Sequence, residues 1–393
     1  MTPCFLLSCG EPSGDLYAGA LTRELRSLAP GTTVTGLGGP QLAAAGGHLI
    51  EDYRGIAVTG LTEALPKLLR YRKALARLVA SAREQRPDAL IVIDFPDFNL
   101  RLAERVRKLG IPIVYYISPQ IWAWRPGRLK TIRALVDRML VIFPFEEQIY
   151  REGGVPVEFV GHPLVDLVKP PAARELFLTG VGLSPDAPTV AVLPGSRPNE
   201  VRRILPDLIL AAGRIRSRVS AAQFVIARAP SLEDELFAIV NTQALSPVAI
   251  VEGDTDAVLS SADVALTASG TATVQAALHG TPMVVVYRVS ALTYRLGRRF
   301  VNLDTFAMVN LIAGQRIVPE LIQDAFTPEA VAGEAVSMLT DASRARTIRE
   351  GLARVRARLG GPGASRRAAE AILGLIPPAR RVTTGDEPRK PMG

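Results

Sequence analysis

Two carboxylates stand where apolar runs of the chain end and helical stretches begin. Glu11 follows the run Phe5–Cys9, and Asp94 closes the run Ala89–Asp94. A carboxylate that is partly removed from water, with a hydroxyl group in reach, is suited to act as a general base. We therefore single out Asp94 as a candidate base. The alternative is that Asp94 caps the following helix, although Asp97 is better placed for that role.

Two turns in the second half of the chain are suited to bind an anion. The segment Thr267–Thr273 opens a helical stretch, and its small residues would let backbone amides approach a phosphate. Leu193–Arg197 also ends an apolar run, and the guanidinium of Arg197 can grip a phosphate with two hydrogen bonds. Taken alone, the first could be a capped helix and the second a solvated charge, but two such turns on one sheet edge favour phosphate binding. The predicted phosphate site comprises Ser196, Arg197, Ser269, Gly270, Thr271, Ala272 and Thr273.

A basic amphipathic stretch precedes Asp94. Leucines recur at helical spacing over residues 61–82, with lysines and arginines interleaved. Such a segment can lie on an anionic membrane surface. More often its apolar stripe packs on a sheet while its charges are solvated, and both roles are compatible if only the first part touches lipid. The predicted lipid contacts are Leu61, Leu65, Leu68, Leu69, Arg70, Tyr71 and Arg72, and residues 287–300 form a second candidate patch.

The strands and helices that position these residues can be predicted from the spacing of apolar residues, which alternates between two periodicities. Short β-branched runs alternate with stretches of helical period, which predicts βαβ units on parallel sheets. We expect strands at Phe5–Cys9, Thr33–Leu37, Ala89–Asp94, Ile111–Ile117, Arg138–Phe143 and Val157–Val160, then at Thr189–Leu193, Gln223–Ala227, Val248–Glu252, Val264–Thr267 and Met283–Tyr287. The two series predict an α/β fold with two Rossmann-like, doubly wound domains facing across a cleft. Ligands of such sheets bind outside the carboxyl ends of the strands, where the candidate residues lie.

The predicted domain organisation has four parts. Residues 1–165 form an amino-terminal domain, and residues 166–327 form a carboxyl-terminal one. Residues 328–376 are helices that pack across both domains, and residues 377–393, rich in proline and arginine, form a disordered tail.

Composition narrows the class of protein. The chain has 393 residues, of which 48% are hydrophobic, so it is not disordered as a whole and can bury a core in each domain. No apolar run has the length of a membrane span, and we expect no secretory signal. Two cysteines are too few for a disulfide framework, which favours the reducing cytoplasm. The net charge of +8 is compatible with nucleic acid, anionic lipid or a phosphorylated substrate, but no nucleic-acid-binding module is recognisable.

Seven short motifs make the chain recognisable. In order and spacing they resemble those of the lipid A disaccharide synthases over residues 4–375. The motifs are Cys9–Asp15, Ile93–Asn99, Tyr116–Trp124, Val160–Leu164, Leu193–Arg197, Ser269–Thr273 and Asn310–Ala313. Each motif is weak alone, but the seven together are specific. The resemblance implies the GT-B fold, in which two Rossmann-like parallel-sheet domains face each other and C-terminal helices follow.

The resemblance also implies an activity. It is that of an inverting glycosyltransferase, which joins UDP-2,3-diacylglucosamine to 2,3-diacylglucosamine 1-phosphate (lipid X) to give the β-1,6-linked lipid A disaccharide 1-phosphate and UDP. No cofactor and no metal are expected. The family's functional positions fall on Glu11, Asp94, Arg197 and Asn310, and we expect Asp94, Glu11 and Asn310 to be catalytic. A homodimer that associates peripherally with the cytoplasmic face of the inner membrane is also expected.

One position departs from the family's pattern. Related sequences commonly have glutamate where this chain has Gln275, and in GT-B enzymes such a residue often holds the ribose hydroxyls. Glutamine offers one acceptor and one donor group in place of an acceptor-only carboxylate. We therefore include Gln275 in the UDP site and expect its contact with ribose to be weaker or arranged differently.

Two other functions share part of this pattern. A UDP-N-acetylglucosamine 2-epimerase would have a similar nucleotide half but would join no sugars. A non-catalytic nucleotide-binding protein, or a nucleic-acid binder, would show salt-sensitive binding without turnover. The roles of His162 and His279 stay open, and a packing role for His162 at the domain junction is as well supported as contact with substrate.

Overall fold

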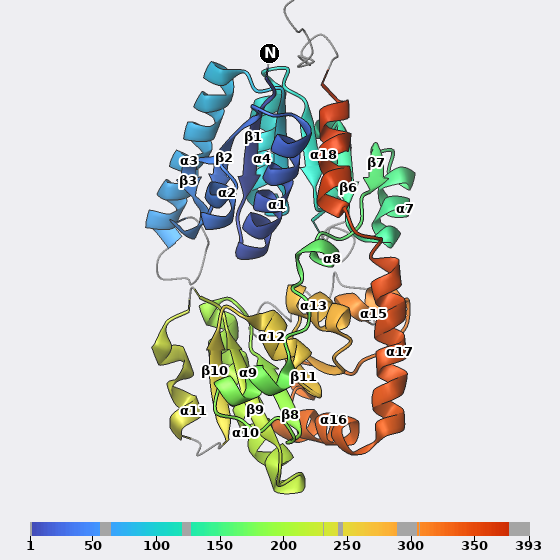
Figure 1. Ribbon diagram of the computed structural model, residues 1–393. Helices are drawn as coiled ribbons and strands as arrows, with labels where there is room; N and C mark the ends of the chain where they lie inside the picture. Colours follow the sequence, from blue (N-terminus) through green and yellow to red (C-terminus); the bar gives the residue numbers. More distant parts are fainter. Residues whose placement is uncertain are drawn as a thin grey trace, which may run out of the picture.

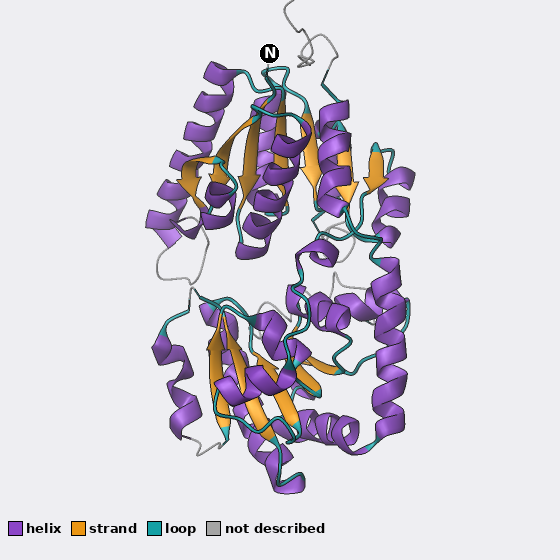
Figure 2. Cartoon of the chain, viewed as in Figure 1, coloured by secondary structure: helices purple, strands orange, loops and turns teal. Residues whose placement is uncertain are grey.

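The computed structural model consists of two α/β lobes, one above the other in Figure 1. It describes residues 2–55, 64–119, 127–230, 232–242, 247–288, 305 and 307–376. Each lobe contains a sheet with helices packed around it (Figure 2). We refer to the lobe of the first sheet as the amino lobe and to that of the second as the carboxyl lobe.

The sheet of the amino lobe has seven strands in the order β3-β2-β1-β4-β5-β6-β7, and every strand pair in it is parallel. Its strands are β1 Cys4–Cys9, β2 Thr33–Gly38, β3 His48–Asp52, β4 Ala89–Ile93, β5 Ile113–Tyr116, β6 Arg138–Val141 and β7 Val157–Phe159. The helices between them are α1 Pro12–Leu28, α2 Pro40–Ala44, α3 Ala64–Gln85, α4 Pro96–Arg107, α6 Arg128–Leu135 and α7 Pro144–Glu152.

The sheet of the carboxyl lobe has six strands in the order β10-β9-β8-β11-β12-β13, again all parallel. Its strands are β8 Thr189–Leu193, β9 Gln223–Arg228, β10 Val248–Glu252, β11 Val264–Ala268, β12 Met283–Tyr287 and β13 Glu320–Ile322. Its helices are α9 Arg174–Gly180, α10 Pro198–Arg218, α11 Ala238–Thr242, α12 Thr255–Ser260, α13 Thr271–His279, α15 Met308–Ala313, α16 Pro328–Thr340 and α17 Ala342–Arg358. The helices α8 Leu164–Leu167 and α18 Ala364–Gly374 belong to the connections between the lobes.

The central strands are apolar throughout because helices cover both faces of each sheet. In β4, Ala89, Ile91 and Ile93 pack into one hydrophobic cluster, while Leu90 and Val92 pack into another on the opposite face. The second cluster lies beneath α3, α4 and α6. The first includes α1 and α18 and continues through the interlobe connection into the carboxyl lobe.

All eleven predicted strands are present, but two further strands were not predicted. β3 and β13 lie at the edges of their sheets, and their side chains are exposed or partly exposed rather than forming a buried apolar run. Neither periodicity nor hydrophobicity therefore distinguishes them from loop sequence. The helices expected after residue 327 are present as α16, α17 and α18. The domain boundaries at residues 165 and 327 stay predictions, and the tail over 377–393 lies outside the described residues.

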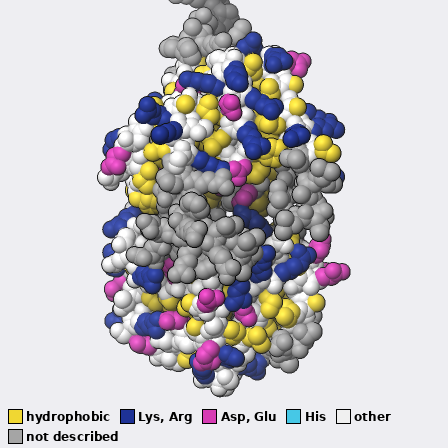
Figure 3. Space-filling view, turned by 180° about the vertical axis from the view of Figure 1, so that it is seen from behind, with side chains coloured by type: hydrophobic (Ala, Val, Ile, Leu, Met, Phe, Trp, Pro, Cys, Tyr) yellow, Lys and Arg dark blue, Asp and Glu magenta, His cyan; other side chains and the backbone are white. Residues whose placement is uncertain are grey.

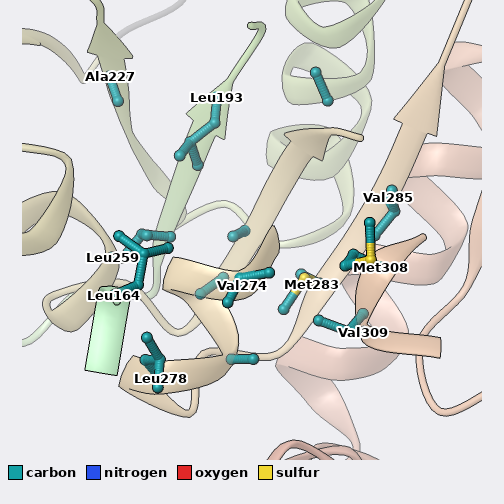
Figure 4. Packing of buried hydrophobic residues seen from close by; sticks show 14 of the residues in the cluster. Leu164, Leu193, Ala227, Leu259, Val274, Leu278, Met283, Val285, Met308 and Val309 are labelled. Carbon is teal, nitrogen blue, oxygen red and sulfur yellow. The ribbon is translucent and has the colours of Figure 1, made fainter. Parts of the chain in front are cut away.

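The chain crosses between the lobes twice, and the two crossings contact each other. The backbone N–H of His162 donates to the carbonyl of Leu359 at 2.8 Å. Asp166 accepts hydrogen bonds from the N–H groups of Gly363 and Ala364 at the start of α18, which packs on α1. Figure 4 shows Leu164, from the first crossing, among the buried side chains of the carboxyl lobe. The second crossing therefore carries the end of the chain back onto the amino lobe.

Two further predictions, on disulfides and on membrane-spanning helices, can be compared with the described residues. Both cysteines, Cys4 and Cys9 of β1, are free. In the part of the chain that the structure describes, no helix has both the length and the apolarity needed to cross a bilayer.

Candidate functional site

The predicted site residues lie at the points where the winding of each sheet reverses. In the amino lobe β1 and β4 are neighbours, and Glu11 and Asp94 follow their carboxyl ends. In the carboxyl lobe β8 and β11 are neighbours, and they are followed by Arg197 and Gly270. Such switch points leave a crevice between the diverging loops, which is where doubly wound sheets bind ligands.

An ion pair joins the two switch points. The Nη2 of Arg197 donates to both carboxylate oxygens of Glu11 at 2.6 Å, and its Nη1 donates to Glu200 at 2.8 Å. Glu11 is the N-cap residue of α1, but its side chain makes no capping hydrogen bond. Its carboxylate therefore reaches across to the other lobe instead of closing its own helix.

Asp94 lies beside this ion pair, partly buried at the end of β4. Burial, together with the negative charge of Glu11, raises the pKa of Asp94 to about 7, against the opposing effects of a hydrogen bond from Phe95 and of the charge on Arg197. A carboxyl group with this pKa is present in both its forms near neutral pH, as a general base requires. It is not the N-cap of α4, because that position belongs to Phe95.

The start of α13 meets the amino lobe directly. The hydroxyl of Tyr17, on α1, lies near the side chain of Thr271, the first residue of α13. The N-cap of α13 is Gly270, which makes no side-chain cap, and the side chain of Thr273 is turned back to the carbonyl of Gly270 at 2.8 Å. The first N–H groups of a helix have no partner within it, so this helix start can receive an anion.

The amide group of Asn310 makes all of its hydrogen bonds within its own segment. Its Nδ2 donates to the carbonyl of Val318 at 2.9 Å and to Glu320 at 2.6 Å. Its Oδ1 accepts from the N–H groups of Ile317 and Val318 at 2.8 and 3.0 Å. These four bonds fill the hydrogen-bonding capacity of the amide. The Asn310 amide thus fixes the loop between α15 and β13, and its expected catalytic role stays a prediction.

Gln275 faces a buried carboxylate of its own lobe. Its Nε2 donates to Oδ1 of Asp256 at 3.4 Å, and Nε2 of His279 lies 3.0 Å from the same oxygen. Asp256 also accepts from the backbone of Lys169 in the first interlobe crossing. A glutamine can donate to this carboxylate, whereas a glutamate there would repel it. The expected contact of Gln275 with ribose stays a prediction.

Two other residues of the motifs are used for packing. The ring of His162 is buried between Tyr17 and Phe143, and burial lowers its pKa to about 3, so it is neutral and suited to a junction core. Asp15 accepts three backbone N–H bonds, from residues 39, 41 and 42. It therefore caps α2, the following helix, rather than its own.

Only part of the predicted lipid patch lies within the described residues. Leu61 lies outside them, as do the side chains of Leu65 and Leu68. Leu69 is 62% exposed, and Arg70 and Arg72 are exposed beside it. The hydroxyl of Tyr71, by contrast, donates to the carbonyl of Asp97, and its ring packs against Phe98 of α4. Tyr71 thus joins two helices, while its neighbours on α3 face outward. Most of the second patch, over residues 289–300, lies outside the described residues.

Sequence reasoning missed three residues around Asp94. They are Tyr17, Asn99 and Tyr115, whose polar atoms contact Thr271 or the backbone of Asp94. Tyr17 and Tyr115 fit apolar helix and strand patterns, so their hydroxyls carry no separate signal. Asn99 ends a recognised motif, which is the one hint that the sequence offers.

Solved structures of an epimerase and of a glycosyltransferase share this fold. The UDP-GlcNAc 2-epimerase from Neisseria meningitidis bound to UDP-GlcNAc matches with a TM-score of 0.66 at 12% identity, covering 95% of this chain and 100% of that one. The calicheamicin glycosyltransferase CalG4 matches with a TM-score of 0.59 at 18% identity, covering 96% and 100%. At these identities the likeness shows the fold alone, and it confirms the predicted GT-B architecture.

Sequence similarity is far stronger to one family. The profile described as lipid-A-disaccharide synthetase matches residues 5–373. The lipid-A-disaccharide synthase of Myxococcus xanthus is 45% identical over 379 residues, which cover 96% of this chain and 99% of that protein. That of Syntrophus aciditrophicus is 45% identical over 372 residues, covering 94% and 97%. Because these matches span nearly the whole chain, the chain belongs to the lipid-A-disaccharide synthetase family, the glycosyltransferases that form the disaccharide of lipid A.

Proposed function

We propose that the space between the two switch points is where this chain joins UDP-2,3-diacylglucosamine to lipid X. The observation that carries this proposal is the meeting of Glu11 and Asp94 with Arg197 and the start of α13. One lobe contributes carboxylates suited to a sugar hydroxyl, and the other contributes positive groups suited to a diphosphate.

Asp94 acts as the general base in this proposal. The 6-hydroxyl of lipid X attacks the anomeric carbon of the donor sugar, opposite the bond to UDP. The new carbon–oxygen bond forms as the proton passes to the Asp94 carboxylate, and the electron pair of the broken bond leaves with the diphosphate of UDP. Proton transfer of this kind contributes about 10²–10⁴-fold to a rate.

Arg197 and the start of α13 stabilise the charge that develops on the diphosphate. Arg197 is held by two carboxylates, Glu11 across the site and Glu200 in its own lobe. The incoming diphosphate takes the place of Glu11 on the guanidinium, and the released Glu11 is then available to a sugar hydroxyl. Ser196 and Ser269, at the same strand ends, add hydroxyl donors.

Asn310 supports the site from a distance in this account. Its four hydrogen bonds fix the segment that joins α15 to β13, and α15 packs against α13. Loss of the amide would disturb the helix that receives the diphosphate. We therefore assign Asn310 a positioning role in the known reaction.

The outer face of the amino lobe binds an anionic membrane in this proposal. Basic residues outnumber acidic ones on each of the adjacent helices α3, α4 and α6. Figure 3 shows Lys and Arg side chains spread among hydrophobic ones over this lobe. Both substrates carry fatty acyl chains, so a surface that holds the enzyme at a bilayer brings the site to them.

Vesicle binding tests the membrane proposal. Leu69→Glu should weaken binding to vesicles that contain phosphatidylglycerol, because it adds a negative charge at an exposed apolar position of α3. Leu176→Glu is the matched control, since Leu176 is 77% exposed but lies on α9 of the carboxyl lobe. Equal vesicle binding by the two variants would count against α3 as the contact. A homodimer, also proposed from the resemblance, is tested by sedimentation equilibrium of the full chain.

A product assay tests the activity itself. The purified chain is incubated with UDP-2,3-diacylglucosamine and lipid X, and we expect the disaccharide 1-phosphate and UDP in equal amounts. Omitting lipid X should abolish UDP release. Epimerised sugar nucleotide without disaccharide would contradict the proposal and favour the epimerase reaction.

A further inference from the structure

The backbone that carries Asp94 is held in a conformation that non-glycine residues avoid. Asp94 has φ 43° and Phe95 has φ 47°, both in the left-handed region. The end of the neighbouring strand β5 is similar, because Ile117 has φ 65° and its carbonyl accepts from the N–H of Asp94 at 3.2 Å. Each such residue costs free energy, most of all a β-branched one, so surrounding contacts must hold it in place.

Two side chains from different elements hold the carbonyl of Asp94. Nδ2 of Asn99, on α4, donates to it at 2.7 Å and to the carbonyl of Ile93 at 3.1 Å. The hydroxyl of Tyr115, on β5, donates to it at 2.8 Å. Oδ1 of Asn99 in turn accepts from the hydroxyl of Ser8, on β1, at 2.7 Å. Both lone pairs of the Asp94 carbonyl are therefore engaged by buried donors from two neighbouring elements.

The ring of Phe95 restrains the same pair of residues from the other side. It lies on the backbone of Gly10 so closely that a Cβ at that position would stand 2.2 Å from a ring atom. The ring also stacks on Phe98, with the centroids 5.4 Å apart. Because Phe95 cannot swing away without losing these contacts, the turn that it shares with Asp94 has little freedom to relax.

We propose that Asn99 and Tyr115 are positioning residues for the general base, which hold the carbonyl of Asp94 so that its carboxylate points at the acceptor hydroxyl. This inference rests on the proposed role of Asp94. Neither residue touches the reacting atoms. They hold the peptide group of Asp94 in place, and its left-handed backbone directs the Asp94 side chain toward Glu11 and Arg197. The charges of these two residues affect the pKa of Asp94. A base that is displaced by about 1 Å can lose about 10²-fold in rate.

The chain offers a matched control on the same strand. Tyr116 follows Tyr115 in β5 and is equally buried, but successive strand residues point to opposite faces. Its hydroxyl is buried and has no hydrogen-bond partner among the described residues. Tyr115→Phe and Tyr116→Phe therefore delete the same atom from the same strand at similar burial, and only one of them acts on the base.

The experiment compares turnover, UDP affinity and pH dependence in these variants. Tyr115→Phe should lower kcat about tenfold, with KM for both substrates and the Kd for UDP within about twofold of wild type. The pH at which its activity is half-maximal should also shift. Tyr116→Phe should match the wild type in all of these quantities. In an Asp94→Asn background, Tyr115→Phe should cause no further loss, because the group that it positions is gone.

A second variant and three outcomes complete the test. Asn99→Ser is too short to reach the carbonyl of Asp94 and should reproduce the loss of kcat, with thermal unfolding confirming that it folds. If it does not fold, Tyr115→Phe decides alone. If Asp94→Asn is inactive but Tyr115→Phe behaves like Tyr116→Phe, the positioning role is overturned, while the role of Asp94 as base stands. An equal loss from Tyr115→Phe in the Asp94→Asn background overturns the positioning role as well. An Asp94→Asn variant with wild-type turnover overturns the base, and the positioning role with it.

Discussion

The two switch points have the same topology but achieve their backbone conformations in opposite ways. At the strand ends of the carboxyl-lobe switch point the positive φ angles fall on glycines, 116° at Gly195 and 155° at Gly270. After β4 and β5 of the amino lobe they fall on Asp94, Phe95 and Ile117, all of which carry side chains. Glycine adopts these angles at little steric cost, whereas the other residues must be held there by hydrogen bonds and packing.

The difference matches the chemistry that we propose for each lobe. A phosphate is bound by backbone N–H groups, so the carboxyl lobe needs a chain that comes close to the ligand, and glycine permits this. A base works only if its own side chain is aimed, so the amino lobe needs a side chain at the strained position. At this switch point, strain without glycine therefore coincides with the residue whose side chain is proposed to act as the base.

The largest effect is expected on the amino side. Asp94→Asn should lower kcat by about 10²–10⁴-fold, because the amide cannot accept the proton. The Kd for UDP should stay near wild type, since we propose that the carboxyl lobe binds the diphosphate. The wild-type kcat should rise with pH through about 7, as the carboxyl group loses its proton, and the residual rate of the variant should lack this step. Stopped assays from pH 5.5 to 9 check both points, and unchanged turnover would remove Asp94 from the role of base.

The next effect is expected on the carboxyl side. Arg197→Ala should weaken UDP binding about 10–100-fold, since a charge-assisted pair of hydrogen bonds contributes about 1.5–3 kcal/mol. Calorimetry with UDP measures it directly. Arg214→Ala is the control, because Arg214 pairs with Glu329 away from the site. An unchanged Kd in Arg197→Ala would separate this residue from the diphosphate.

The sequence predicted the positions of both switch points but not the contacts that support their backbone. Central strands such as β4 and β8 were identifiable because a strand covered on both faces is apolar throughout. Asp94 and Arg197 follow such strands directly, so their place at the carboxyl edges follows from the topology. The edge strands β3 and β13 lack that signal and were missed.

Most of the supporting contacts left no local pattern in the sequence, for a physical reason. The positive φ at Asp94 is held in part by Tyr115, which lies 21 residues away on another strand, so no local pattern records that contact. Asn310 shows the converse. An amide that binds a ligand and one that ties a loop look the same in the sequence, and only the four local bonds reveal that its capacity is used.

A glycine substitution tests the comparison itself. Gly270→Ala places a side chain in open space, but at φ 155° and ψ −160°, where only glycine is comfortable. We expect a loss of about 1–3 kcal/mol in the free energy of unfolding and a weaker affinity for UDP. Gly213→Ala, within α10 and equally free of neighbours, should instead gain about 0.5–1 kcal/mol. Thermal unfolding and calorimetry of both variants show whether the cost at Gly270 comes from the backbone.

The smallest effect is expected at the ion pair that joins the two sides, and it should have the opposite sign. Glu11→Gln removes the competitor that holds Arg197 across the site, so UDP should bind about 2–5-fold more tightly, as fits an exposed ion pair of about 0.5–1 kcal/mol. Turnover should fall, because the proposed sugar contact is lost.

Two control experiments distinguish release of the Arg197 guanidinium from a general effect of removing a negative charge. Glu200→Gln removes an equal charge from the same Arg197 but leaves the interlobe pair in place, so it should not tighten UDP binding. In an Arg197→Ala background the gain from Glu11→Gln should vanish, because nothing remains to be released. A gain that persists in that background would mean that Glu11 acts on the diphosphate only through its long-range charge. In that case Arg197 would not pass from Glu11 to the diphosphate when the donor binds, although the two switch points are neighbours in space.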